Sequence, residues 1–198
     1  MKEFARRIIK FILKILVIIV YRPKIVGAEN IEEGKPALIC PNHVHALDSV
    51  VIVLMNKRVI RVLAKEVLFK NPVLRWLASI FGVYPVKQNN KSMESMKISL
   101  KILKNNELLL IFPEGTRKGM AKGVKAKEGA IKLAAKSNAP IIPVGVQGSF
   151  RPFTRVKLNI GKPINYNLTK EELNDKEKLR ELTDGLMDEI VKLRDEKI

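Results

Sequence analysis

The chain holds two histidines, and both lie in one short stretch, Asn-His-Val-His-Ala-Leu-Asp, at residues 42–48. A catalytic zinc ion needs three protein ligands. Beyond the two histidines the chain offers one cysteine, Cys40, which falls in a predicted strand, so we expect no metal site here. A general base has different needs, because one ring nitrogen must reach the substrate proton while an acceptor holds the other. Asp48 is such an acceptor.

Three interpretations of residues 42–48 stay open. If His43 lies in a loop and Asp48 in the first turn of a following helix, Asp48 can fix the tautomer of His43 and stabilise its imidazolium form. If His45 is the base instead, Asp48 lies three residues away, within one helical turn. Alternatively, Asp48 only caps a helix that begins near Ser49, and both histidines are ordinary turn residues.

A second polar cluster, Phe-Pro-Glu-Gly-Thr-Arg-Lys, occupies residues 112–118. Gly115 permits close approach of the backbone to a ligand, and Arg117 can bind a phosphate through two parallel hydrogen bonds. Further lysines follow at positions 122, 125 and 127. The cluster favours a phosphate ligand, and a surface turn with solvated lysines is the alternative. The P-loop pattern is missing from the sequence, so a nucleotide site is not indicated.

Short β-rich runs alternate with longer helical patterns, which is typical of an α/β sheet protein. The predicted strands are residues 24–26, 37–40, 60–64, 83–86, 108–112, 141–146 and 157–160, and the predicted helices are residues 49–55, 72–81, 91–104 and 127–137. A last helix is expected from Thr169, because Thr169 and Glu172 form a capping box. Both polar clusters directly follow a strand. Ligands collect at the carboxyl ends of strands, so we predict one shared site.

Residues 1–22 form a distinct N-terminal segment, and residues 23–198 are expected to be one domain. The longest apolar run of the segment, residues 15–21, is far shorter than the roughly 20 residues that span a bilayer. Interrupting lysines and the lack of a small-residue cleavage site argue against a signal peptide. On a helical wheel the charged residues share one side and the apolar residues the other. We expect a helix lying in the membrane interface, with docking on the protein's own core as the alternative.

The charge balance implies an anionic partner. Lys and Arg number 37 against 20 Asp and Glu, a net charge of +17. An anionic membrane, a phosphorylated metabolite, an acidic carrier protein or nucleic acid would each fit such a surplus. Aromatic residues are only 6% of the chain and no nucleic-acid module signature is present, so we expect no nucleic-acid partner. A single cysteine excludes an internal disulfide.

Together these blocks resemble the glycerolipid acyltransferase family, in particular its 1-acylglycerol-3-phosphate O-acyltransferases. The family shares an N-H-x-x-x-x-D block, an F-P-E-G-T-R block and a later apolar block with prolines, which correspond here to residues 42–48, 112–117 and 139–145. The resemblance covers about residues 37–148. It implies one α/β domain with a mixed sheet flanked by helices.

The resemblance also implies an activity. A fatty acyl group would pass from acyl-CoA or acyl carrier protein to the sn-2 hydroxyl of 1-acylglycerol 3-phosphate, giving phosphatidic acid at the cytoplasmic face of the cell membrane, without a metal or cofactor. His43 would be the general base and Asp48 its orienting partner. Glu114, Gly115, Thr116 and Arg117 would bind the glycerol phosphate, and Pro143 would shape the pocket.

One position departs from the family pattern. The family has an arginine at the end of a G-x-x-x-x-x-R block, whereas the matching residues 82–88 end in Gln88. Lys87 can supply the charge there, as a point charge without a planar fork. Gln88 motivates one rival function, acylation of another lysophospholipid. A rival from another class is a basic binding module for anionic membranes or nucleic acid, in which the histidines do no chemistry.

Overall fold

The computed structural model describes residues 2–86, 93–117, 119 and 123–197. Seven strands form one sheet in the order β1-β7-β6-β2-β5-β3-β4. Their bounds are β1 Lys24–Val26, β2 Ala37–Pro41, β3 Ile60–Lys65, β4 Val83–Val86, β5 Leu108–Leu110, β6 Ile141–Gln147 and β7 Lys157–Ile160. Neighbouring strands are parallel except for the antiparallel pair β6–β7. The prediction of one α/β domain with a mixed sheet is therefore confirmed.

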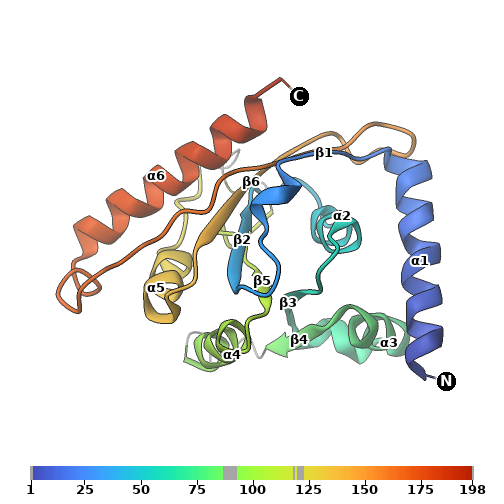
Figure 1. Ribbon diagram of the computed structural model, residues 1–198, viewed down its shortest axis with the longest axis horizontal. Helices are drawn as coiled ribbons and strands as arrows, with labels where there is room; N and C mark the ends of the chain where they lie inside the picture. The colour runs from blue at the N-terminus through green and yellow to red at the C-terminus, as the bar shows by residue number, and fades with distance from the viewer. Residues whose placement is uncertain (1, 87–92, 118, 120–122, 198) are drawn as a thin grey trace.

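Helices cover both faces of the sheet (Figure 1). Helices α1 Lys2–Tyr21, α2 Asp48–Met55 and α3 Pro72–Phe81 lie on one side, and α4 Met93–Lys104, α5 Gly129–Ser137 and α6 Lys176–Asp195 on the other. Two short 3-10 helices, η1 Ala28–Asn30 and η2 Glu66–Lys70, lie in connections. With this layering, central strands such as β2 are buried on both faces, which explains their continuous apolar sequence.

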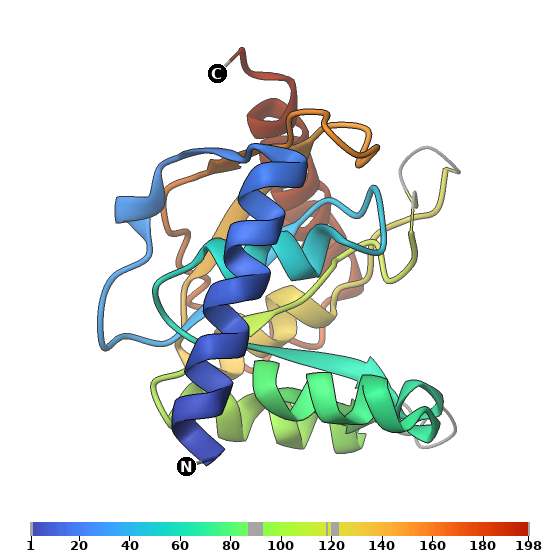
Figure 2. The same cartoon turned by 90° about the vertical axis from the view of Figure 1, so that its right-hand side faces the viewer.

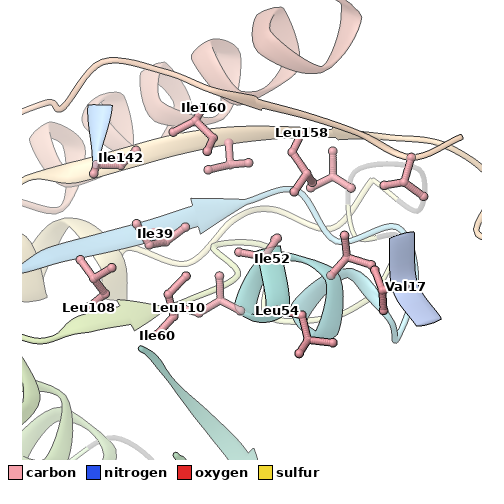
Figure 3. Close-up of a cluster of buried hydrophobic side chains, with 14 of the residues drawn as sticks. Val17, Ile39, Ile52, Leu54, Ile60, Leu108, Leu110, Ile142, Leu158 and Ile160 are labelled. Carbon is pink, nitrogen blue, oxygen red and sulfur yellow. The ribbon is translucent and has the colours of Figure 1, made fainter. Parts of the chain in front are cut away.

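Successive side chains of a strand point to opposite faces of the sheet, so the hydrophobic core has two clusters, one on each face. Ile39 points toward the α1 and α2 side, whereas Leu38 and Cys40 point toward α4, α5 and α6. Figure 3 shows the first cluster, which includes Leu110 of β5, Ile52 of α2 and Val17 of α1. This packing fixes α2 against the sheet, and the first turn of α2 carries Asp48.

Three element boundaries differ from the expected ones. Strand β5 ends at Leu110 and not at residue 112, since Phe112 already belongs to the polar turn. Helix α5 begins at Gly129 rather than Lys127, whose backbone N–H donates to the carbonyl of Pro113. Residues 91 and 92, the expected start of α4, lie outside the described residues.

The last helix was expected to begin at Thr169, and that expectation is wrong. Thr169 and Glu172 do form the reciprocal hydrogen bonds of a capping box, at 2.8 and 3.2 Å. These bonds close a turn that does not continue as a helix. Helix α6 begins at Lys176, where the Asp175 carboxylate accepts from two backbone N–H groups of the first turn.

The N-terminal segment is the helix α1 that its sequence predicts. In the part of the chain that the structure describes, no helix is both long enough and apolar enough to cross a bilayer.

Candidate active site

Asn42 fixes the carboxyl end of strand β2. Its buried side chain donates to the carbonyl of Val146 at 2.9 Å and accepts from the N–H of the same residue at 2.6 Å. This two-point contact ties the end of β2 to the end of β6. The next residue, His43, therefore leaves the sheet from a rigid position.

His43 and Asp48 are in contact, as the first of the three interpretations requires. Nδ1 of His43 lies 2.9 Å from Oδ2 of Asp48, whose side chain is fully buried. The same oxygen accepts from the backbone N–H groups of Val44 and His45 at 2.7 and 2.8 Å. The loop thus curls around the carboxylate, and two residues five positions apart meet.

This arrangement does not fit the helix-cap interpretation. Helix α2 begins at Asp48 itself, its N-cap position is Leu47, and that position makes no side-chain cap. The Asp48 carboxylate faces back into the preceding loop instead of forward to the N–H groups of the helix.

The ring of His43 is held on two sides. It stacks on Phe112 with ring centroids 3.9 Å apart, and Asp48 accepts from Nδ1. A neutral imidazole with its proton on Nδ1 presents Nε2 as the basic nitrogen. The site therefore orients one nitrogen for proton transfer.

His45 lies in a different environment. Its side chain is exposed, its Nδ1 accepts from the backbone N–H of Leu47 at 3.2 Å, and its ring stacks on Phe150. Asp48 is linked to the backbone of His45 and to the ring of His43. The geometry thus favours His43 over His45 as the residue that Asp48 orients.

Glu114 joins the two polar clusters. Its Oε1 accepts from the backbone N–H of His43 at 2.7 Å, and the side chain is 1% exposed. Gly119 makes room for it, since a Cβ on that residue would lie 2.7 Å from Oε2. We interpret Glu114 as a residue that positions the His43 loop, because a buried carboxylate would repel a phosphate.

The exposed part of the second cluster is cationic. Gly115 adopts a φ of 63° and donates its N–H to Phe112, so the chain turns and presents Thr116 and Arg117 to solvent. Lys127 lies over this turn, with Nζ 3.2 Å from where a Cβ of Gly115 would be. From the sequence, Lys127 was only one of several lysines that follow the second cluster. Its approach to Gly115 depends on the backbone bond between Lys127 and Pro113, which spacing alone does not reveal.

One predicted site residue, Pro143, is not brought to the cluster. Pro143 pairs with Cys40 inside the sheet, and its ring lies beside Gly161 and Leu193 on the α6 side. Strand alternation therefore directs Pro143 away from the face that α1 and α2 cover. Lys87, together with Gln88, lies outside the described residues. Cys40 is buried, and burial raises the pKa of its thiol, which fits a small core residue.

An apolar groove of about 650 Å³ begins beside the His43 loop. Ala46 and Leu47 line its start, and its walls come from α1, α2, β3, η2 and α3. Such a volume lies within the range of small-molecule sites. The sequence did not reveal the groove, since its walls come from segments far apart along the chain.

The chain is similar to known proteins. A family model described as "Acyltransferase" matches residues 22–147. A 1-acyl-sn-glycerol-3-phosphate acyltransferase of Bacillus subtilis is 30% identical over 180 residues, which are 86% of this chain and 87% of that protein.

A chloroplastic enzyme of the same name from Arabidopsis thaliana, LPAT1, is 28% identical over 75% of this chain, which spans only 42% of that protein. The crystal structure of the 1-acyl-sn-glycerophosphate acyltransferase PlsC from Thermotoga maritima superposes with a TM-score of 0.72 at 22% identity, covering 100% of this chain and 85% of that one. The last likeness shows the fold. The extent of the family match and the Bacillus relative show that the chain belongs to the acyltransferase family.

Proposed function

We propose that the protein transfers a fatty acyl group from a thioester, acyl-CoA or acyl carrier protein, to the sn-2 hydroxyl of 1-acylglycerol 3-phosphate, giving phosphatidic acid. The observation that carries the proposal is the 2.9 Å contact between His43 and Asp48 at the start of an apolar groove. The names of the Bacillus and Arabidopsis relatives support the acceptor.

His43 would act as the general base. Its Nε2 takes the proton of the acceptor hydroxyl while that oxygen attacks the thioester carbonyl. The tetrahedral intermediate then expels the thiolate, which recovers the proton from His43. Asp48 stabilises the imidazolium between these two steps, and a base of this kind contributes about 10²–10⁴-fold in rate. The route uses no acyl-enzyme.

The acceptor phosphate would bind at the second cluster. Arg117 offers a planar fork, Thr116 a hydroxyl, and Gly115 a backbone that can approach closely. Lys127, which lies over Gly115, adds a charge. Lys87 remains a further candidate for phosphate binding. A different lysophospholipid acceptor, which Gln88 favours, is the second candidate function.

The groove would hold an acyl chain. Its described lining is almost wholly aliphatic or aromatic, with Ser49 near the His43 loop. An apolar chain gains free energy in proportion to the area it buries there. The catalytic loop and the groove share Ala46 and Leu47, so a chain in the groove would bring its carbonyl or glycerol end toward His43.

Helix α1 would lie on the cytoplasmic membrane surface. Eight of its large apolar side chains are exposed, among them Phe4, Phe11 and Ile19, while Val17 is buried. A helix docked on the protein's own core would turn most of these side chains inward. The exposed apolar face favours the membrane interpretation over docking.

Acyl transfer tests the proposal directly. Labelled acyl-CoA and acyl carrier protein are incubated with lysophosphatidic acid or other lysophospholipids in detergent micelles, using the wild type, His43→Ala and His45→Ala. We expect transfer to lysophosphatidic acid, lost only in folded His43→Ala. Transfer to another lysophospholipid alone would favour the second function. If the wild type acylates none of them, the non-catalytic membrane-binding module replaces both.

A further inference from the structure

Residues 66–76, which comprise η2 and the first half of α3, carry an unusual number of exposed apolar side chains. Val67, Leu68, Val73, Leu74 and Trp76 are between 45% and 61% exposed. Single exposed apolar residues are common on soluble proteins, but five within ten positions form a patch, and such patches mark protein or membrane interaction sites.

The rest of the protein covers only part of the apolar face of α3. Val73 and Ile80 are seven residues apart and therefore share a helix face, with Trp76 and Leu77 between them. Ile80 is 5% exposed in the core, whereas Val73 is 61% exposed. One continuous face is thus buried at its carboxyl end and uncovered at its amino end. The fold positions this face without covering it.

The patch faces α1 across the apolar groove, which Leu68 and Leu74 of the patch also line. Helices α1 and α3 both line the apolar groove, through Leu16 and Val20 on one wall and Leu77 and Ala78 on the other. Figure 2 looks onto this side of the molecule, with the carboxyl end of α3 beside the N-terminal half of α1 and the start of α3 farther away. The two uncovered faces therefore flank one groove.

Charge indicates what covers the patch. Lys70 and Arg75 are exposed within it and Lys65 directly before it, against one exposed acid, Glu66. Basic side chains around an apolar face complement an anionic bilayer, and tryptophan is favoured at the headgroup level. A second copy of the chain would bring the same basic side chains together, in a protein of net charge +17.

We propose that η2 and the first half of α3 form a second membrane-docking element, which inserts Val67, Val73 and Trp76 into an anionic bilayer across the groove from α1. The groove then opens toward the acyl layer, between the two elements. The role of the groove rests on the proposed function, whereas the docking itself does not.

The protein contains its own probe, because Trp76 is the single tryptophan of the chain. Its emission is recorded with vesicles of phosphatidylcholine and phosphatidylglycerol, and again with vesicles whose phosphatidylcholine is brominated on the acyl chains. We expect a blue shift on binding and quenching by the brominated lipid. Protein that sediments with vesicles while Trp76 neither shifts nor is quenched would overturn the proposal, since α1 alone would then hold it there.

A matched pair of variants gives a second readout. Val67→Asp combined with Val73→Asp changes two side chains that do not line the groove. We expect the partition coefficient on anionic vesicles to fall about tenfold or more, from lost apolar burial and added negative charge. Val26→Asp, at a valine of 40% exposure on the edge strand β1, is expected to bind as the wild type does. Equal loss in both variants contradicts a specific role for η2 and α3, and circular dichroism checks that each is folded.

Self-association of the protein through the patch would give a different result. If Trp76 emission shifts with protein concentration in the absence of lipid, and the double variant makes a dimer monomeric, the patch is an interface between copies and the proposal is wrong. Lipid binding is measured without substrate. A protein that docks but transfers no acyl group would refute the proposed function alone, and an active protein whose Trp76 stays in water would refute the docking alone.

Discussion

Replacing Asp48 by asparagine removes the negative charge of the carboxylate and keeps the shape of the side chain. Oδ2 of Asp48 accepts from the ring of His43 and from two backbone N–H groups. In the Asp48→Asn variant the amide oxygen can take over all three bonds, so the loop should keep its path. What the variant loses is the negative charge beside the imidazole.

Two costs follow from the geometry. Oδ1 of Asp48 is buried and has no hydrogen-bond partner among the described residues, so the amide nitrogen would occupy that position with its donors unpaired. An unpaired buried donor costs about 1–3 kcal/mol of stability. The neutral amide also fails to stabilise the imidazolium. We expect kcat to fall about 10²–10⁴-fold, or about 3–5 kcal/mol of activation free energy.

The assay compares kcat at saturating acceptor with the free energy of unfolding. Asp175→Asn is the matched control, since Asp175 also accepts from two backbone N–H groups, but at the exposed start of α6. We expect the control to cost up to about 1 kcal/mol of stability and to leave kcat unchanged. His43→Ala combined with Asp48→Asn should be no slower than His43→Ala alone, because residues that act as a unit are not additive. A folded Asp48→Asn variant with nearly wild-type kcat would refute the role of the charge.

Three further substitutions test the groove and the loop. Ala78→Phe fills the groove wall on α3 and should shift the preference toward shorter acyl donors, measured by competition among donors of different length. Gly119→Ala places a Cβ 2.7 Å from Oε2 of Glu114 and should displace that side chain from the N–H of His43, lowering kcat about tenfold or more while KM changes less. Phe150→Ala removes a ring that stacks on His45 and contacts Tyr21; we expect a loss of about 3–5 kcal/mol in the free energy of unfolding, measured by denaturant titration. Unchanged chain preference, unchanged kcat or unchanged stability, respectively, would contradict these three expectations.

The sequence predicted the site best where the strand pattern, the polar loop and the start of the next helix all agree. The apolar run 37–40 and the polar residues after it indicated a strand end, and Asp48 falls in the first turn of the next helix as expected. A short loop between two such anchored elements leaves few paths, so the meeting of His43 and Asp48 was one of three interpretations that the spacing left open, and the family resemblance selected it. Glu114 was correctly placed at the neighbouring strand end, but its bond to the N–H of His43 depends on the order β2-β5.

The features that the sequence did not predict depend on contacts between distant parts of the chain. The capping box of Thr169 and Glu172 forms its bonds, yet α6 begins seven residues later, because local hydrogen bonds do not by themselves propagate a helix. Pro143 belongs to a recognisable block, but its side chain is directed by strand alternation to the α6 side, which the block does not encode. The groove arises from packing among distant segments, so no local pattern predicts it.

The orientation of α1 supports the membrane interpretation through its polar side as well. Lys10 and Lys14 are half-buried and lie around a small cavity with Asn56 and Lys57, at the carboxyl end of α2. A helix carboxyl end carries partial negative charge and attracts cations. Part of the cationic side of α1 thus faces the protein, while eight large apolar side chains of α1 are exposed and others, such as Val17, contact the core. Such an orientation exposes apolar area at a cost in water and becomes favourable when lipid covers that area, so vesicles should raise the resistance of α1 to proteolysis.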